Sequence, residues 1–349
     1  MPSTNNSTTV PFAQRTIALN NGTGAVPALA FGTFNATKEH LLAAIRSGIR
    51  HFDTAEGYLN ERVVGEAIAA AIAEGSVKRA ELFVTTKLWN THHEPHVVRP
   101  ALEASLKRLG LEYVDLYLTH FPLAVRDPNP GDYETFAFPA ADGKGADVLE
   151  GVTLGATWAA MEALVDAGLT RAIGVSNYSV AQLAETVAGA RIKPAVHQVE
   201  LHAALPQREL RAAGAKHGIV TAAYSALGTG VGFIGATGVL HHPAVAAIAK
   251  AAGLSAGELL LRWVAEQPDV ITIFRSSSEE RIAATAAAAS GPLPAEAVAK
   301  LEAFGAANPL RTCNLPGMAK GNEPFFGTDL PSSYAELKPQ EEAAAGQKQ

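Results

Sequence analysis

Short runs rich in β-branched and aromatic residues alternate with longer runs of helical pattern from residue 29 to residue 288, and no other feature restricts the fold of this chain as strongly. This alternation is typical of repeated strand–helix units, which build a parallel sheet. We predict eight strands, at Leu29 to Gly32, Ile49 to Asp53, Leu82 to Lys87, Val114 to His120, Ala172 to Ser176, Ala195 to Glu200, Ile219 to Tyr224 and Val270 to Phe274. We predict eight helices between and after them, at Lys38 to Ser47, Glu61 to Glu74, His96 to Leu109, Thr157 to Ala167, Val180 to Ala188, Arg208 to His217, Pro243 to Ala252 and Glu279 to Ala288. Eight such units specify a closed α/β barrel of the (β/α)8 or TIM type more naturally than an open sheet.

The N-terminal part of the chain predicts a hairpin. Two short runs, Arg15 to Leu19 and Val26 to Leu29, flank the turn signal Asn20-Asn21-Gly22. They indicate a β-hairpin that closes the bottom of the barrel, with a disordered arm as the alternative. We expect residues 1–14 to form a flexible arm, residues 15–334 to form a single domain and residues 335–349 to form a polar tail.

Further segments are expected at the C-terminal rim of the barrel. An extra helix is predicted at Pro294 to Phe304, and Ser277 and Glu280 have the spacing of a capping box at the start of the last barrel helix. Three stretches are long enough for lids or binding loops, at Pro122 to Thr153, Ser225 to His242 and after Ala306.

Composition and charge exclude several classes of function. The chain is 48% hydrophobic and 18% charged, as in an ordinary globular protein, and its net charge of −6 gives no basic field for nucleic acid or an anionic membrane. A single cysteine, Cys313, allows no internal disulfide, and no apolar run is long enough to span a membrane. We therefore expect a cytoplasmic protein, monomeric by default, without nucleic-acid or membrane partners.

The histidines at His92, His93 and His96 lack the spacing of a metal site, so no metal is expected.

Four polar residues lie at or just after the ends of predicted strands. They are Asp53, Lys87 and His120 at three strand ends, and Tyr58 in the loop that follows Asp53. In a TIM barrel such residues converge at the C-terminal rim, where active sites form.

These four residue types can deliver a proton. A tyrosine phenol has an ordinary pKa of about 10, and a nearby ammonium favours its ionised form. Lys87, held by Asp53, would make Tyr58 a general acid, and a neutral His120 would donate a hydrogen bond to the same substrate oxygen. Singly, each residue is more often structural, but their occurrence together predicts a site for carbonyl reduction with a separate hydride source.

With these residues in place, the chain resembles the aldo-keto reductases. The likeness covers about residues 15 to 305, and its motifs are GTFNATKE, HFDTAEGYLNERVVGEAI, TTKLWN, SLKRLGLEYVDLYLTHFP, GLTRAIGVSNYS, IKPAVHQVELH, LPQREL, AAYSALG, LLLRW and RSSSEERI. The resemblance implies Tyr58 as the acid, Asp53 and Lys87 as its modulators, His120 as the orienting residue and NAD(P)H as the hydride donor.

The resemblance also implies a cofactor site. Ser176, Asn177 and Gln198 would hold the nicotinamide carboxamide, and Tyr224 would stack on its ring. Ser225 and Leu227 would line the pyrophosphate path, and Arg275, Ser276 and Arg281 match the positions that hold the adenosine phosphate. Because a helix N-terminus and two guanidiniums suit a 2′-phosphate, we expect NADPH rather than NADH. The chain departs from the family at three of these positions. The family often has Glu and Asn where this chain has Ala284 and Thr285, which changes the contacts expected with the adenine ring. The family usually has Asn where this chain has His197.

The glycines of Gly230 to Gly235 match a dinucleotide motif but precede no helix, so they do not indicate a Rossmann fold.

Aromatic residues are expected to form the substrate pocket, with a small-molecule carbonyl compound as the ligand. The predicted pocket residues are Phe34, Trp89, Asn90 and Phe121, which favour an apolar or aromatic carbonyl compound, while Asn90 leaves a sugar aldehyde open. Two other functions are considered. One is a non-catalytic NADPH-sensing module, and the other is a Schiff-base lyase that uses Lys87.

Overall fold

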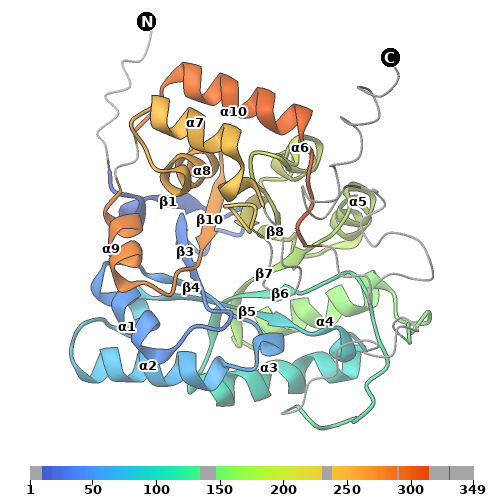
Figure 1. Ribbon diagram of the computed structural model, residues 1–349. Coiled ribbons are helices and arrows are strands. Elements are labelled where there is room, and N and C mark those ends of the chain that lie inside the picture. The colour runs from blue at the N-terminus through green and yellow to red at the C-terminus, as the bar shows by residue number, and fades with distance from the viewer. Residues whose placement is uncertain (1–9, 134–146, 230–237, 289–290, 314–329, 331–349) are drawn as a thin grey trace, which may run out of the picture.

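A computed structural model of the chain describes residues 10–133, 147–229, 238–288, 291–313 and 330. Among these residues, eight parallel strands form a closed barrel surrounded by helices, in the order β10-β3-β4-β5-β6-β7-β8-β9 (Figure 1). The strands are β3 (Leu29–Gly32), β4 (His51–Asp53), β5 (Phe83–Leu88), β6 (Val114–Thr119), β7 (Thr170–Ser176), β8 (Val196–Glu200), β9 (Val220–Tyr224) and β10 (Val270–Phe274). The predicted TIM barrel is confirmed, and each predicted strand agrees with the observed one to within two residues.

Helices cover the outside of the barrel. They are α1 (Lys38–Arg46), α2 (Glu61–Ala73), α3 (Pro95–Leu109), α4 (Leu154–Asp166), α5 (Val180–Gly189), α6 (Arg208–Ala215), α7 (Pro243–Ala251), α8 (Ala256–Ala265), α9 (Glu279–Ala287) and α10 (Ala295–Ala307). Several begin at a Ser or Thr whose side chain accepts a backbone N–H of the first turn, as Ser179 does for α5 and Ser255 for α8.

Two details of the helix prediction are corrected. The helix that packs on β10 is α8, which the prediction omitted, whereas α7 packs against α8 and the extra helix α10 (Figure 1). The N-cap of α9 is Ser278, whose Oγ accepts the backbone N–H of Arg281, so the cap lies one residue after the predicted Ser277.

The N-terminal hairpin is confirmed and closes the bottom of the barrel. Strands β1 (Thr16–Ala18) and β2 (Ala25–Pro27) pair antiparallel. The side chain of Asn20 in their turn donates to the carbonyl oxygens of Pro194 and His217 at 2.9 and 3.2 Å. These two residues precede β8 and β9, so the hairpin contacts the amino ends of the strands. The described part of the predicted arm contains the short 3-10 helix η1 (Phe12–Gln14), whose Phe12 is buried. Residues 1–9, the tail 335–349 and Gly230 to Gly235 lie outside the described residues.

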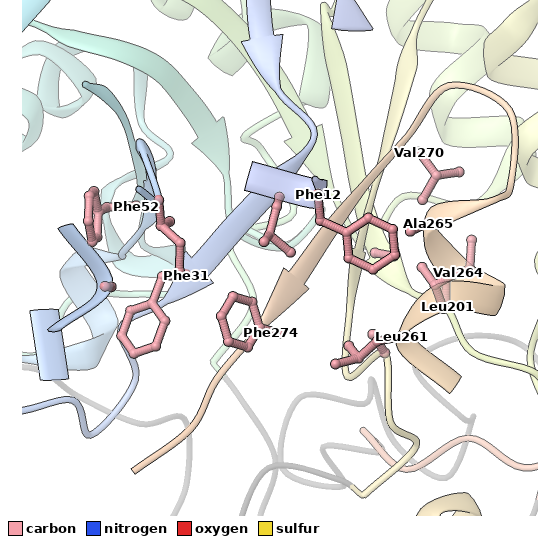
Figure 2. Close-up of a cluster of buried hydrophobic side chains, with 14 of the residues drawn as sticks. Phe12, Phe31, Phe52, Leu201, Leu261, Val264, Ala265, Val270 and Phe274 are labelled. Carbon is pink, nitrogen blue, oxygen red and sulfur yellow. The ribbon is translucent and has the colours of Figure 1, made fainter. Parts of the chain in front are cut away.

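Alternate residues of each strand enter two different cores. Ala30, Leu118 and Ile271 belong to a cluster that fills the barrel interior, whereas Phe31 and Phe274 face the surrounding helices. The two phenylalanine rings lie on neighbouring strands and meet edge to face, with centroids 5.6 Å apart (Figure 2). This alternation is the period-two pattern expected of strands with two buried faces.

No single helix among the described residues is long and apolar enough to cross a membrane, and α7 and α8 meet that test only as a pair bent by 81°.

Candidate active site

Lys87 lies at the centre of the site and is completely buried on β5. Its Nζ donates to Oδ1 of Asp53 at 2.6 Å, to the carbonyl oxygen of Thr54 at 2.8 Å and to the phenol oxygen of Tyr58 at 3.2 Å. An ammonium has three N–H donors, so each finds an acceptor. Burial alone would lower the pKa of Lys87, but the carboxylate of Asp53 and the phenol of Tyr58 outweigh it and raise the pKa. The lysine is therefore held as a cation.

Tyr58 ends the short 3-10 helix η2 (Glu56–Tyr58), and a turn after β4 brings its phenol back over Lys87. The next residue, Leu59, has a φ of 55°, in the left-handed region that a branched side chain rarely adopts. Asn35, Asn177 and Ser225 also have positive φ and all three line the same cavity as Tyr58. Backbone conformations of this kind cluster at functional sites, where the surrounding structure holds them in place.

Two opposing effects act on the pKa of Tyr58. Burial raises it, and the nearby charge of Lys87 lowers it only in part, so the net direction is upward. The lysine thus lowers the pKa of the phenol, as expected, but does not reverse the effect of burial. A phenol with a raised pKa remains protonated at neutral pH, which is the form that can donate.

His120 follows β6 and contacts Tyr58, with ring centroids 5.8 Å apart. Burial lowers its pKa well below the usual range, and the charge of Lys87 lowers it further, so the ring is neutral. A neutral imidazole carries one proton. Nδ1 is buried and has no hydrogen-bond partner among the described residues, so Nε2 is the nitrogen left to donate to a ligand.

Amide side chains from neighbouring strand ends extend the site away from Lys87. Nε2 of Gln198 on β8 donates to Oδ2 of Asp53 at 2.7 Å. Nδ2 of Asn177 donates to the carbonyl oxygen of His120 at 2.9 Å, and its Oδ1 accepts from the hydroxyl of Tyr224 at 2.7 Å. Polar side chains thus join the ends of β6, β7 and β9 to one another, and join the end of β8 to the end of β4, at one rim.

A cavity of about 310 Å³ opens above these residues. Among the predicted site residues, its lining includes Asp53, Tyr58, His120, Ser176, Asn177, Gln198, Tyr224, Ser225, Leu227 and Arg275, together with Phe34, Trp89 and Phe121. Lys87 does not line the cavity and acts on it through Tyr58 and Asp53. In the part of the chain that the structure describes, no cluster of three or more His, Cys, Asp or Glu side chains could hold a metal ion.

Besides Lys87, three predicted residues lie outside the lining of the cavity. The side chain of Asn90 is buried and is not among the lining residues. Ser276 and Arg281 also lie outside the lining. Nε of Arg281 donates to Oγ of Ser276 at 3.3 Å, at the start of α9 and directly after Arg275. Ser276 and Arg281 therefore continue the site along the surface from Arg275, and we call the part of the cavity that Arg275 lines its arginine end.

Sequence reasoning missed two parts of the site. From the sequence, Cys313 indicated only the absence of an internal disulfide, but it lines the cavity. Glu56, two residues before Tyr58, is buried and accepts the backbone N–H of Trp89 at 3.3 Å and contacts Nδ1 of His92. It ties η2 to the end of β5. The position of Glu56 two residues before Tyr58 could have indicated that it supports the site. No nearby sequence motif indicates that Cys313 lies there.

Comparisons with known proteins identify the family of the chain. A model of the aldo/keto reductase family matches residues 19–306. Aldose reductase B of Dictyostelium discoideum is 38% identical over 274 residues, which are 77% of this chain and 86% of that protein. The NAD(P)H-dependent D-xylose reductase I,II of Candida tropicalis is 39% identical over 279 residues, 77% of this chain and 85% of that protein. The crystal structure of a Bombyx mori aldo-keto reductase in complex with NADP superposes with a TM-score of 0.69 at 35% identity, and covers 83% of this chain and 92% of that one.

The fold and these comparisons thus define a TIM-barrel oxidoreductase, with the candidate site at the C-terminal rim of the barrel. The chain belongs to the aldo/keto reductase family, as its resemblance implied, and is by class an NAD(P)H-dependent carbonyl reductase.

Proposed function

We propose that this protein reduces an aldehyde or ketone to the corresponding alcohol with NADPH, and that Tyr58 is the general acid. One observation carries the proposal. The ammonium of Lys87 contacts both Asp53 and Tyr58, and the phenol of Tyr58 lines the cavity beside a neutral His120. A protonated phenol and a neutral imidazole are the two donors that a carbonyl oxygen needs as it gains negative charge.

The residues that line the cavity suit a nicotinamide cofactor. Gln198 keeps an N–H and its carbonyl oxygen for a carboxamide after bonding Asp53, and Oδ1 of Asn177 keeps a second lone pair. Ser176 lines the cavity beside them, and Tyr224 offers an aromatic ring. When bound, the nicotinamide supplies the hydride. These side chains would hold and orient it next to Tyr58.

The arginine end of the cavity favours NADPH over NADH. Arg275 lines the cavity, and Arg281 lies in the first turn of α9, where the positive end of the helix dipole favours an anion. Ser276 lies between them and would add a hydroxyl. Two guanidiniums at this position suit a 2′-phosphate, which only NADPH carries. Ser225 and Leu227 line the cavity and would border the pyrophosphate.

The walls of the cavity favour an apolar or aromatic carbonyl compound. Phe34 meets Tyr58 edge to face, with centroids 5.3 Å apart, and Trp89 meets His120 at 5.3 Å. Phe121 stacks on the ring of His120, with centroids 4.9 Å apart, and also contacts Trp89. A sugar aldehyde stays the alternative substrate, although Asn90, its predicted polar contact, is not among the lining residues.

The Schiff-base alternative is disfavoured by the surroundings of Lys87. An amine must lose its proton to attack a carbonyl carbon. All three donors of this lysine are occupied, and its pKa is raised. A non-catalytic sensing module would not need four reacting side chains in contact, so turnover distinguishes it from a reductase. The monomeric state and the cytoplasmic location stay predictions.

An assay of NADPH absorbance with a panel of aldehydes and ketones tests the proposal. Tyr58→Phe removes the proton donor and little volume, so we expect a loss of about 10² to 10⁴ in kcat while NADPH binding changes little. Tyr178→Phe is a matched control, because this buried phenol, two residues after β7, accepts a hydrogen bond from Thr119 and is not among the lining residues. More than half of the wild-type kcat in Tyr58→Phe would show that another group is the acid.

A further inference from the structure

Glu200, the last residue of β8, is buried and binds a segment far away in the sequence. Its Oε1 accepts the backbone N–H of Thr312 at 2.6 Å and the hydroxyl of the same residue at 2.7 Å. Its Oε2 accepts the backbone N–H of Cys313 at 3.0 Å. Nε2 of His202 contacts Oε1 at 2.9 Å. One carboxylate therefore organises both the end of β8 and the chain 112 residues later.

The segment 310–313 has a second, weaker attachment on the same loop. The backbone N–H of Leu310 donates to the carbonyl oxygen of Ala204 at 3.2 Å, and Leu310 is completely buried. Just before the segment, Gly305 of α10 lies against the carbonyl group of Ala203, where a Cβ atom would find no room. The helix and the segment thus follow the loop after β8, and Glu200 provides the charged contact at the inner end.

This attachment matters because the segment forms part of the cavity wall. Cys313 lines the cavity together with Tyr224, and the Tyr224 hydroxyl is close enough to affect the pKa of the Cys313 thiol. Glu200 itself does not line the cavity and contacts none of Asp53, Tyr58 and His120 among the contacts described above. Its effect on the cavity therefore passes through the position of Thr312 and Cys313.

We propose that Glu200 is a positioning residue for substrate selection: by holding residues 312–313 it fixes one wall of the cavity without taking part in proton or hydride transfer. The inference rests on the proposed function in one respect, that the cavity receives the carbonyl substrate. The carboxylate must be ionised for this role, because every partner named above donates to it. Burial alone would raise the pKa of Glu200, but the hydrogen bonds from His202 and Thr312 outweigh it and lower the pKa.

Glu200→Gln is the sharpest variant, because it keeps the volume and replaces an acceptor oxygen with an N–H₂ group. That group would face backbone N–H donors, and a lost hydrogen bond to a charged group is costly. We expect the segment to detach. Thr312→Val removes the hydroxyl that donates to Glu200 and should loosen the segment in the same way but to a smaller extent. It tests the same contact if Glu200→Gln does not fold.

The only cysteine of the chain reports detachment directly. Burial, followed by the charge of Glu200, raises the pKa of Cys313 to about 12, so the thiol of the docked segment reacts slowly. We expect Glu200→Gln to speed the reaction of Cys313 with the aromatic disulfide DTNB at pH 8 by at least about tenfold, because an exposed thiol has a pKa of about 8.5. Glu162→Gln is the matched control, since this buried carboxylate on α4 accepts the backbone N–H of Ile192 and does not line the cavity.

Steady-state kinetics complete the test. For a bulky aromatic aldehyde, we expect Glu200→Gln to raise KM about fivefold or more, whereas kcat for a small aliphatic aldehyde stays within about twofold, as expected when uniform binding is lost. Unchanged DTNB labelling, or an equal fall of kcat for both substrates, overturns the inference. Labelling needs no turnover, so a protein that reduces no carbonyl compound contradicts the proposed function, while slow labelling in Glu200→Gln contradicts this inference.

Discussion

The side-chain amide of Gln198 donates a hydrogen bond to Oδ2 of Asp53 over 2.7 Å, and both residues are buried. The other carboxylate oxygen of Asp53 accepts from Lys87 at 2.6 Å. Asp53 is therefore bound on one side by the residue proposed to hold the nicotinamide and on the other by the lysine that contacts the acid. A change in the position of Gln198 would reach Tyr58 through two short hydrogen bonds.

Gln198→Leu removes the donor to Asp53 and the proposed carboxamide contact while keeping the volume similar. A hydrogen bond between neutral groups contributes about 0.5 to 1.5 kcal/mol, so we expect NADPH to bind about two- to tenfold more weakly. We expect kcat to fall as well, because Asp53 loses a hydrogen bond to its charged carboxylate. Fluorescence titration and steady-state kinetics measure the two effects. Gln267→Leu on the bottom of the barrel, where the amide bonds Arg211, is the control. A weaker affinity with unchanged kcat at saturating NADPH would mean that Gln198 does not act on Asp53.

Lys87→Met should abolish most activity near neutral pH. The charge of Lys87 lowers the pKa of Tyr58, so its removal raises that pKa further and makes the phenol a weaker acid. Reduction needs the protonated phenol, so kcat/KM falls as the pH rises through the pKa of Tyr58, and in the variant this fall should move to higher pH. The pH profile of kcat/KM is the measurement, with NADPH binding as the check that the variant is folded. A variant with the wild-type rate and the wild-type profile would contradict the coupling of the two residues.

Much of the barrel was predictable because each unit repeats a local pattern. The eight strands and the placement of Asp53, Lys87 and His120 at strand ends follow from alternation and chain order alone. The confusion of α7 with α8 has a local cause as well. Both segments are apolar and helical, they are separated by four residues, and only packing on β10 decides which one belongs to the barrel.

Other properties of the site depend on how the folded chain is arranged in space. Trp89 and Asn90 are neighbours at the end of β5, yet only Trp89 lines the cavity, because adjacent side chains point in different directions. The net pKa of Tyr58 depends on how deeply the folded chain buries it, which no motif records. The contact between Glu200 and Cys313 joins residues 113 positions apart and has no periodic signature.

His197 predicts a loss of stability in acid. It is buried on β8, its Nε2 accepts the backbone N–H of Tyr178 at 3.2 Å, and burial lowers its pKa to about 3. Between about pH 6.5 and about pH 3, His197 is protonated in the unfolded chain but neutral in the folded chain. The free energy of unfolding therefore decreases as the pH falls through this range. One histidine contributes a slope of about 1.4 kcal/mol per pH unit.

His197→Asn should flatten that slope by up to this amount, because Asn has no proton to gain and its amide oxygen still offers an acceptor. Urea denaturation at pH 7, 5.5 and 4.5 measures the free energy of unfolding, and exposed His217→Asn is the control. Equal slopes for the wild type and His197→Asn would show that other groups dominate the acid response.

The double substitution Arg275→Ala with Arg281→Ala should weaken the binding of NADPH far more than that of NADH. Nη2 of Arg275 donates to the carbonyl oxygen of Asn35 at 3.2 Å, which keeps this guanidinium at the rim, and Nε of Arg281 contacts Ser276. Each charged hydrogen bond to a 2′-phosphate contributes about 1.5 to 3 kcal/mol, so the loss for NADPH should exceed about tenfold. Fluorescence titration with both cofactors measures it, and Arg99→Ala on the exposed face of α3 is the control. Equal losses for NADPH and NADH would mean that the arginines act on the fold or on the part of the cofactor that both share, and the preference for NADPH would then need another physical basis.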